Sequence, residues 1–250
     1  MKGRDRRRTA WLWGVPLILV GLIPFSAHGS STAGPEDLKA LVSSLHWLGH
    51  DSFRIDGDGL VLYIDPFQLK GGPKADLILI THDHMDHCSP ADVAKIQKPD
   101  TIIVTVAQAA AKLSGQIKIV KPGDALTVKG VSIKTLPAYN LNKFRSPGVP
   151  FHPKESGYVG FLIQVKGRTI YHAGDTDFIP EMKGLAPDVA LLPVSGIYVM
   201  TWEEAVEAAN AIRPKVAVPM HIGGPIGEMS SADRFKEKAA VPVWILPLEK

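Results

Sequence analysis

The sequence Asp76-Leu77-Ile78-Leu79-Ile80-Thr81 runs directly into His82-Asp83-His84-Met85-Asp86-His87. A short continuous apolar run is typical of a strand that is buried on both faces of a sheet. Imidazole nitrogens and carboxylate oxygens are the ligands that Zn²⁺ and similar cations prefer. So many polar groups have little use in a core, because each unpaired buried polar group costs free energy. The segment therefore predicts a strand with a metal site at its carboxyl end, where open α/β sheets tend to place ligands.

Strand-like and helix-like segments alternate along the rest of the chain. Asp56-Gly57-Asp58-Gly59 separates two apolar runs and favours a hairpin turn. Ser89-Pro90-Ala91-Asp92 predicts a helix that begins with an N-cap and a proline. Thr201-Trp202-Glu203-Glu204 is a capping box, and it predicts a helix that Pro214 ends. A short helix is expected over 107–113, and strands over 52–55, 60–64, 77–81, 117–120, 125–128, 131–136, 159–165, 169–172, 188–193 and 216–219.

Residues 143–157 are rich in proline, glycine and charge and have no regular pattern. Loops of that length are uncommon inside a compact domain and are often functional. Three basic residues of this loop, Lys143, Arg145 and Lys154, are candidates for binding an anionic or oxygen-rich group. The alternative is a charged loop that is simply solvated.

The composition fits one α/β domain with a substantial core. The chain has 250 residues, of which 45% are hydrophobic, so global disorder is excluded. Its net charge is +3, but residues 1–29 hold five basic residues against one acidic, which leaves the remainder near −1. No basic face follows from this balance, and nucleic acid is therefore not an expected partner. Cys88 is the only cysteine, which excludes an internal disulfide, and we interpret it as a small buried residue rather than a soft metal ligand.

The N-terminal segment has the pattern of a secretory signal. A basic stretch over 2–8 precedes an apolar run over 11–25, and Ala27-His28-Gly29 offers small residues for cleavage. The run is shorter than the ~20 residues that span a bilayer. We expect a signal peptide over 1–29, a linker and entry segment over 30–44, and export to the periplasm or the extracellular space. The alternative is an uncleaved anchor, and membrane contact would then come through this segment alone.

The pattern His-x-His-x-Asp-His after an apolar strand resembles the signature of the metallo-β-lactamase superfamily. The later segments are similar to one branch, the predicted metal-dependent hydrolases related to sugar-phosphate lactonases and N-acyl-phosphatidylethanolamine phospholipase D. The resemblance implies an α/β fold, an αββα sandwich of two mixed sheets with helices on the outer faces, over 45–250. The segments that carry it, besides 82–87, are Leu48–Phe53, Tyr63–Phe67, Tyr171–Thr176, Leu191–Val194 and Pro219–His221.

The same resemblance implies a ligand set for two metal ions. His82 and His84 match the ligands of a first ion, and residues two apart on an extended segment point to the same side. Asp86, His87 and His221 match those of a second ion. Asp175 matches an aspartate that bridges both ions, which its two oxygens allow.

One position departs from the superfamily pattern. The usual further histidine of the first site is replaced in Pro137-Ala138-Tyr139-Asn140, and asparagine is a weak neutral ligand for zinc. His152 and His172 are the available substitutes, and each could instead support the ligands or bind substrate. His50 matches an early histidine of the branch and is expected at the rim of the pocket.

These ligands imply a hydrolase. Two divalent ions, Zn²⁺ or alternatively Mn²⁺, lower the pKa of a shared water, and the hydroxide formed attacks a carbonyl or phosphoryl centre. Asp86 is the expected catalytic residue, which orients that hydroxide. We expect an ester, lactone or phosphodiester substrate that is a small molecule or lipid-like. A Gly-x-Ser-x-Gly elbow is absent from the sequence. The alternatives are a mononuclear iron enzyme of redox or sulfur chemistry and a non-catalytic, metal-stabilised interaction module.

Overall fold

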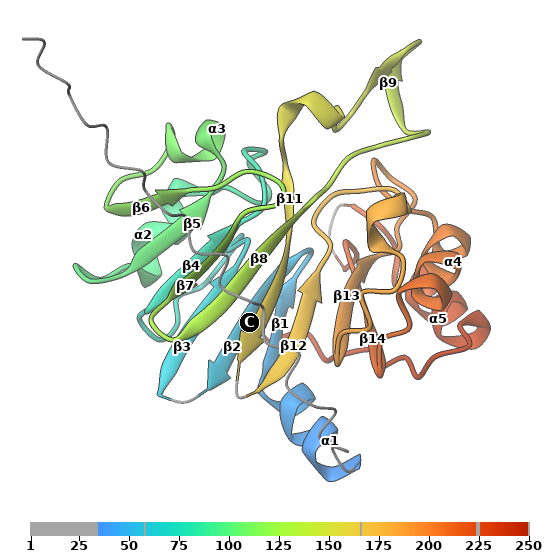
Figure 1. Ribbon diagram of the computed structural model, residues 1–250, viewed down its shortest axis with the longest axis horizontal. Coiled ribbons are helices and arrows are strands. Elements are labelled where there is room, and N and C mark those ends of the chain that lie inside the picture. Colours follow the sequence, from blue (N-terminus) through green and yellow to red (C-terminus); the bar gives the residue numbers. More distant parts are fainter. Residues whose placement is uncertain (1–34, 58, 166, 224–225, 250) are drawn as a thin grey trace, which may run out of the picture. The chain divides into compact units, whose positions relative to one another are not determined.

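A computed structural model describes residues 35–57, 59–165, 167–223 and 226–249 (Figure 1). The predicted signal peptide over 1–29 lies outside these residues. Within the predicted linker over 30–44, helix α1 covers Pro35–Ser43. Among the helices of the described ranges, none has the length and apolar character needed to span a membrane.

The first sheet is mixed and has six strands in the order β1-β2-β3-β4-β5-β6. Its first three strands pair antiparallel, and β3, β4, β5 and β6 pair parallel. The strand β4, predicted from its apolar run, is fully buried in the middle of the parallel part. The strands are β1 Leu45–Gly49, β2 Ser52–Gly57, β3 Leu60–Ile64, β4 Leu77–Ile80, β5 Ile102–Thr105 and β6 Gln116–Ile119.

The second sheet is also mixed and has the order β14-β13-β12-β11-β8-β7. Strands β7, β8, β11 and β12 pair antiparallel in that order, whereas β12, β13 and β14 pair parallel. A turn at Lys129-Gly130 joins β7 to β8. The strands are β7 Ala125–Val128, β8 Val131–Pro137, β11 Val159–Val165, β12 Arg168–His172, β13 Val189–Pro193 and β14 Val216–Met220.

The predicted helix starts are confirmed. The side chain of Ser89 accepts a hydrogen bond from the backbone N of Asp92 at the start of α2. Thr201 and Glu204 form the capping box of α4, which ends before Pro214. The helices are α2 Pro90–Ile96, α3 Ala107–Ala110, which is shorter than expected, α4 Trp202–Ile212 and α5 Met229–Lys238, and two 3₁₀ turns cover Lys154–Ser156 and Pro180–Met182.

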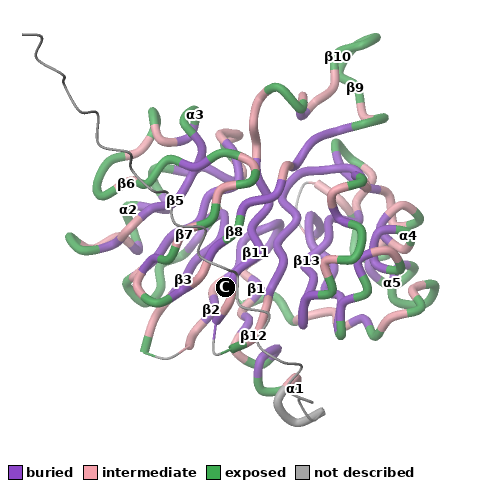
Figure 2. The backbone as a smooth tube through the Cα atoms, in the orientation of Figure 1, coloured by how far each residue is buried: buried purple, intermediate pink, exposed green. Residues whose placement is uncertain are grey.

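The two sheets share one hydrophobic core and carry helices on their outer sides, which confirms the predicted αββα sandwich (Figures 1 and 2). Parallel strands β4, β13 and β14 are buried along their whole length, which the unbroken apolar run predicted for β4. Helices α4 and α5 pack against each other and against β13 and β14. The carboxyl ends of β4, β12 and β14 lead into the loops that carry His82, Asp175 and His221.

The predicted irregular loop over 143–157 contains a small hairpin instead. Strand β9, Phe144–Ser146, pairs antiparallel with β10, Val149–Pro150. Figure 1 shows this hairpin extending away from the two sheets. Val149 and Pro150 line one cavity together with Asp83 and His84, so the hairpin and the metal motif belong to the same end of the domain.

Candidate metal centre

Four side chains form a first cluster: His82, His84, His152 and Asp175. The Nδ1 atom of His84 lies 3.1 Å from Nε2 of His82 and 3.3 Å from Nε2 of His152. Nε2 of His152 lies 3.2 Å from Oδ2 of Asp175. Ligands held about 2.0–2.1 Å from a tetrahedral zinc are ~3.3 Å apart. The cluster therefore has the spacing of a ligand set.

A second cluster consists of His50, Asp51, His87 and His221, and all four residues are buried. His50 and Asp51 lie between β1 and β2, while His221 follows β14 directly. Both His50 and His221 have left-handed backbone conformations, with φ of 52° and 61°. Their loops are joined by backbone bonds, because the N–H of His221 donates to the carbonyl of His50 at 3.2 Å. Residues about 170 positions apart are thus held in one site.

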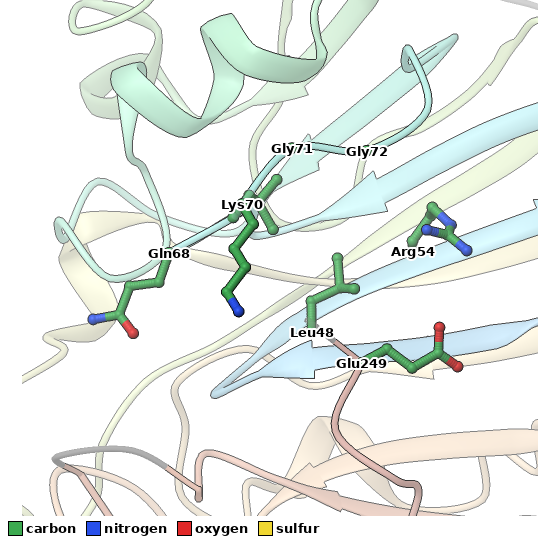
Figure 3. A pocket seen from close by; sticks show the side chains of 8 residues that line it. Leu48, Arg54, Gln68, Lys70, Gly71, Gly72 and Glu249 are labelled. Atoms are coloured by element: carbon green, nitrogen blue, oxygen red, sulfur yellow. The ribbon is translucent and has the colours of Figure 1, made fainter.

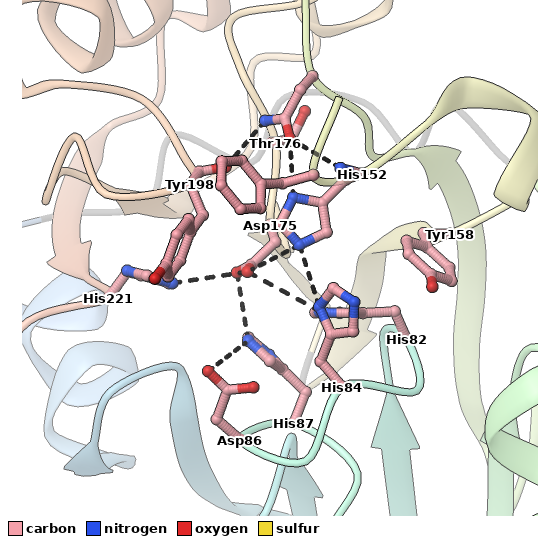
Figure 4. Close-up of polar contacts among 12 residues, drawn as sticks. His82, His84, Asp86, His87, His152, Tyr158, Asp175, Thr176, Tyr198 and His221 are labelled. Carbon is pink, nitrogen blue, oxygen red and sulfur yellow. Dashed lines mark hydrogen bonds and ion pairs between the residues drawn. The ribbon is translucent and has the colours of Figure 1, made fainter. Parts of the chain in front are cut away.

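Asp175 lies between the two clusters, as Figure 4 shows. Its Oδ1 is 3.3 Å from Nε2 of His87 in the second cluster. Its Oδ2 is 3.2 Å from Nε2 of His152 in the first cluster and 3.5 Å from Nε2 of His221 in the second. A carboxylate in this position can bind one cation with each oxygen.

Several buried polar atoms of this centre have no hydrogen-bond partner among the described residues. An unpaired buried donor or acceptor normally costs about 1–3 kcal/mol, so a group of them in one place needs a reason. A divalent cation would satisfy them together, and its preferred ligands are the atoms present here. The residues therefore fit a metal. The atoms are His50 Nε2, Asp51 Oδ1 and Oδ2, His87 Nε2, Asp175 Oδ1 and His221 Nε2.

Asp65 orients one histidine of each cluster. Its Oδ2 accepts hydrogen bonds from Thr81 Oγ1 at 2.6 Å and from His87 Nδ1 at 2.9 Å. Because the Thr81 hydroxyl donates its proton to Asp65, it accepts the bond from Nδ1 of His82 at 2.9 Å. The Nε2 lone pairs of His82 and His87 therefore remain available to a metal, as in other metal sites with an outer carboxylate.

Asn140 supports a ligand and is not itself in either cluster. Its Oδ1 accepts hydrogen bonds from both the backbone N and the Nδ1 of His152, each at 2.9 Å. Its Nδ2 donates to the carbonyl of Tyr198 at 2.9 Å. Of the two substitutes for the missing histidine, the structure brings His152 into the first cluster.

His172 also stays outside both clusters. Its Nε2 donates to the carbonyl of Asp51 at 2.9 Å, and its Nδ1 accepts from the backbone N of Gly174 at 3.2 Å. It thereby ties the loop of Asp51 to the loop of Asp175.

Ser195 supports a histidine of the second cluster in the way that Asn140 supports His152 in the first. Its Oγ lies 2.8 Å from Nδ1 of His221.

Asp86 lies at the exposed edge of the second cluster. Its Oδ2 is 3.2 Å from Nε2 of His50 and 4.0 Å from Nε2 of His87, and 26% of its side chain is exposed. Burial acts to raise the pKa of Asp86, but its ion-pair contact with His50 and the charge of His87 hold that pKa below the ordinary value. Asp86 is therefore ionised at neutral pH.

The electrostatics of the centre differ from residue to residue. Burial lowers the pKa of His82 well below its ordinary value, which favours the neutral ring that a metal needs. Burial also acts to lower the pKa of His87, but the carboxylates of Asp175 and Asp65 raise it well above that value. Burial and the charge of Asp175 raise the pKa of Asp51. Without a metal, the second cluster therefore holds protons that a cation would displace.

Cys88 takes no part in the centre. It is buried beside α3, with Sγ 3.9 Å from the carbonyl of Ala109, and burial raises the pKa of its thiol to about 11. A thiol of such high pKa is unreactive at neutral pH.

Two residues of the centre, Asp51 and Asp65, received no role from the sequence. Asp65 directly follows β3, the parallel neighbour of β4, and so it emerges at the same sheet edge as His82. A prediction that these two strands are neighbours could therefore have identified Asp65 as a residue of the site. Asp51 gives no comparable signal, because its burial depends on packing against His87 and His221.

Comparison with known proteins places the chain in a family. A domain model described as the beta-lactamase superfamily domain matches residues 44–221. The fold and the site thus define a member of the metallo-β-lactamase superfamily. A UPF0173 metal-dependent hydrolase of Methanopyrus kandleri is 34% identical over 194 residues, which are 71% of this chain and 83% of that protein. The chain belongs to this UPF0173 family.

Solved structures agree with this placement. A protein of Parabacteroides distasonis is 33% identical with a TM-score of 0.71, and the match covers 82% of this chain and 93% of that one. Igni18, a metallo hydrolase of Ignicoccus hospitalis, is 26% identical with a TM-score of 0.66, and that match covers 82% of this chain and 95% of Igni18.

Proposed function

We propose that this protein is a hydrolase that holds two divalent cations, zinc or manganese, and cleaves an ester, lactone or phosphodiester. One observation carries the proposal: Asp175 lies between two clusters of ligand atoms, with Oδ1 3.3 Å from His87 and Oδ2 3.2 Å from His152. A purely structural site is closed by four ligands around one ion, whereas a shared carboxylate between two clusters is typical of two-metal hydrolases.

When bound, such ions polarise a substrate oxygen and lower the pKa of a water molecule towards neutrality. The chain itself supplies orientation. Asp86 is ionised and partly exposed, so its carboxylate can accept a hydrogen bond from the attacking water. Asp65 and Asn140 fix the ring orientations of the histidine ligands.

The first test is elemental mass spectrometry on the purified full-length chain, combined with hydrolysis assays. We expect about two equivalents of zinc or manganese per chain and turnover that chelation removes and added metal restores. One equivalent of iron with oxygen consumption would instead establish the redox alternative. Stable metal binding without turnover on any ester, lactone or phosphodiester would favour the interaction module.

A cavity of about 280 Å³ adjoins the first cluster and is the proposed substrate pocket. His84 lines it, so a substrate there lies next to a ligand of the first ion. Its other lining residues are Asp83, Arg145, Val149, Pro150, Phe151, Pro153, Ser156 and Tyr158. A larger cavity of about 410 Å³ lies beside residues 68–72 and contains none of the candidate ligands (Figure 3).

Arg145 gives this pocket a preference for anions. Of the three basic residues singled out in the loop, Lys143 pairs with Glu204 at 2.6 Å and Lys154 pairs with Glu181 at 3.0 Å. Arg145 has no carboxylate partner in the described part of the chain. Its guanidinium lies 5.5 Å from the centre of the Phe151 ring and donates to the Phe151 carbonyl. It is therefore free to bind a carboxylate or phosphate of the substrate.

Apolar side chains near the pocket add a second preference. Phe144 and Val149 of the β9–β10 hairpin are exposed, and Met85, beside His84, has 77% of its surface exposed. Exposed apolar groups of this size around a site indicate contact with an apolar ligand. The preferred substrate on this view is an ester or phosphodiester in which an anionic group adjoins an apolar chain, in keeping with a lipid-like molecule.

The variant Arg145→Ala tests the substrate preference. It should raise KM for an anionic ester about tenfold or more and leave a neutral ester of the same chain length nearly unchanged. Lys154→Ala is the matched control, because Lys154 already has an acidic partner. Equal effects of Arg145→Ala on both esters would contradict the proposed anion contact.

We also propose that the protein is exported, since the N-terminal basic and apolar stretches have the pattern of a signal peptide. N-terminal sequencing of the protein recovered from the periplasm or the medium tests this. A chain that begins near residue 30 supports export, while an intact N-terminus in the membrane fraction supports the anchor.

A further inference from the structure

Asp51 stands apart from the other carboxylates buried in this domain. Its side chain is fully buried, and neither carboxylate oxygen has a hydrogen-bond partner among the described residues. Asp65 and Asp92, also buried, each accept backbone and side-chain hydrogen bonds. Buried carboxylates are normally paired or bound to a metal, so the state of Asp51 needs an explanation.

The surroundings of Asp51 supply one. Its ligand atom lies within 4.8 Å of those of His50, His87 and His221, whose Nε2 atoms are also unpaired. A proton shared between Asp51 and Asp175 would satisfy one oxygen of each carboxylate. It would leave the other oxygen of Asp51 unpaired, whereas one cation at this point can bind the Asp51 carboxylate and the nitrogens of His87 and His221 together.

We propose that Asp51 is a ligand of the second metal ion, together with His87 and His221. The inference rests on the proposed two-metal function and assigns a carboxylate that the superfamily motif does not contain. Asp86, the carboxylate of the motif, is 4.0 Å from Nε2 of His87 and contacts His50. Asp51 is thus a ligand beyond the motif, and it lies deeper in the site than Asp86, whose side chain is partly exposed.

The first experiment compares Asp51→Asn with the wild type, both as the full chain. The substitution keeps the size of the side chain and removes its charge. We expect the affinity for the second zinc equivalent, measured by competition with a chromophoric chelator, to fall at least about 100-fold. The melting temperature in chelator should stay the same or rise, because an unpaired buried carboxyl is removed. A merely structural role would lower it.

Asp92→Asn is the matched control. Asp92 is a buried carboxylate outside both clusters, and it accepts bonds from the backbone N–H groups of Gln68 and Leu69. Its substitution should lower the melting temperature with and without zinc and leave both zinc affinities unchanged.

A second variant gives a direct signature of ligation and covers the case in which Asp51→Asn does not fold. Asp51→Cys loaded with cobalt(II) should show an intense near-ultraviolet absorption from thiolate-to-metal charge transfer, since thiolates bind such ions directly. The wild type should lack the band, because its only cysteine, Cys88, lies outside the described clusters. Absence of the band in a folded, cobalt-loaded variant would overturn the inference.

The outcomes separate this inference from the proposed function. If the wild type binds two zinc ions and Asp51→Asn binds both with unchanged affinity, the role of Asp51 is wrong and the two-metal hydrolase stands. If the wild type binds one ion, the two-metal proposal is wrong, and loss or retention of that ion in Asp51→Asn still decides whether Asp51 is a ligand. If the wild type binds none, both proposals fail.

Discussion

The two ligand clusters differ in how they are exposed and how their atoms are paired. In the first cluster, His84 is partly exposed and lines the cavity of about 280 Å³, and the ligand nitrogens contact one another. In the second cluster every residue is buried, and its atoms account for most of the unpaired polar atoms of the centre. This difference indicates that the two clusters have different roles. In the proposed two-metal enzyme, the ion of the first cluster would face the substrate, and the ion of the second would neutralise the buried charges and join the loops of His50 and His221.

The largest effect is expected from the residue that the clusters share. Asp175→Ala removes the carboxylate whose two oxygens lie 3.3 Å from His87 and 3.2 Å from His152, one histidine of each cluster. It should reduce metal content at both sites. It should also lower kcat/KM on the order of 1,000-fold or more, which corresponds to a loss of several kcal/mol of transition-state stabilisation. Metal analysis and hydrolysis assays measure the two losses. If the variant keeps two ions, Asp175 does not bridge them.

Asp65→Ala is expected to weaken both clusters together, because Asp65 orients His87 directly and His82 through Thr81. Loss of such an outer partner typically costs 10–100-fold in metal affinity. Zinc titrations should therefore show a parallel loss at both sites, and Asp65→Asn, which keeps an acceptor oxygen, should lose less. A loss confined to one site would show that the clusters are supported independently.

Some of these site residues could be predicted from the sequence, and others could not. His82, His84 and His87 could be assigned because they lie in one short segment after a strand whose apolar pattern is unmistakable. The choice between Asn140 and His152 stayed open, since it depends on a contact between two loops and not on local pattern. Asp51 was missed for the same reason. The αββα sandwich followed from the resemblance, whereas strand alternation alone was merely compatible with it.

The metal affinities of the two sites should respond differently to a fall in pH. Burial lowers the pKa of His82 and of His84, so those rings are neutral at pH 7 and bind metal without losing a proton. In the metal-free second cluster, the pKa of Asp51 is raised by burial and Asp175, and that of His87 is raised by Asp175 and Asp65 despite burial.

Metal binding to the second cluster must therefore release protons, and its affinity should fall about tenfold per pH unit for each proton released as the pH drops. The first site should be nearly insensitive until its histidines protonate. Calorimetric titration in buffers of different ionisation enthalpy counts the protons. Equal proton release at both sites would show that the two clusters do not differ in this way.

The smallest expected effects come from the paired outer contacts of the two clusters. Asn140→Ala removes the acceptor of Nδ1 of His152, and Ser195→Ala removes the partner of Nδ1 of His221. Each should weaken one ion by about tenfold, the first-site ion in Asn140→Ala and the second-site ion in Ser195→Ala. Because the first cluster adjoins the cavity, Asn140→Ala should also raise KM, whereas Ser195→Ala should act on metal retention alone. If both variants weaken the same ion, then the assignment of His152 and His221 to separate sites is wrong, and the centre behaves as one coupled unit.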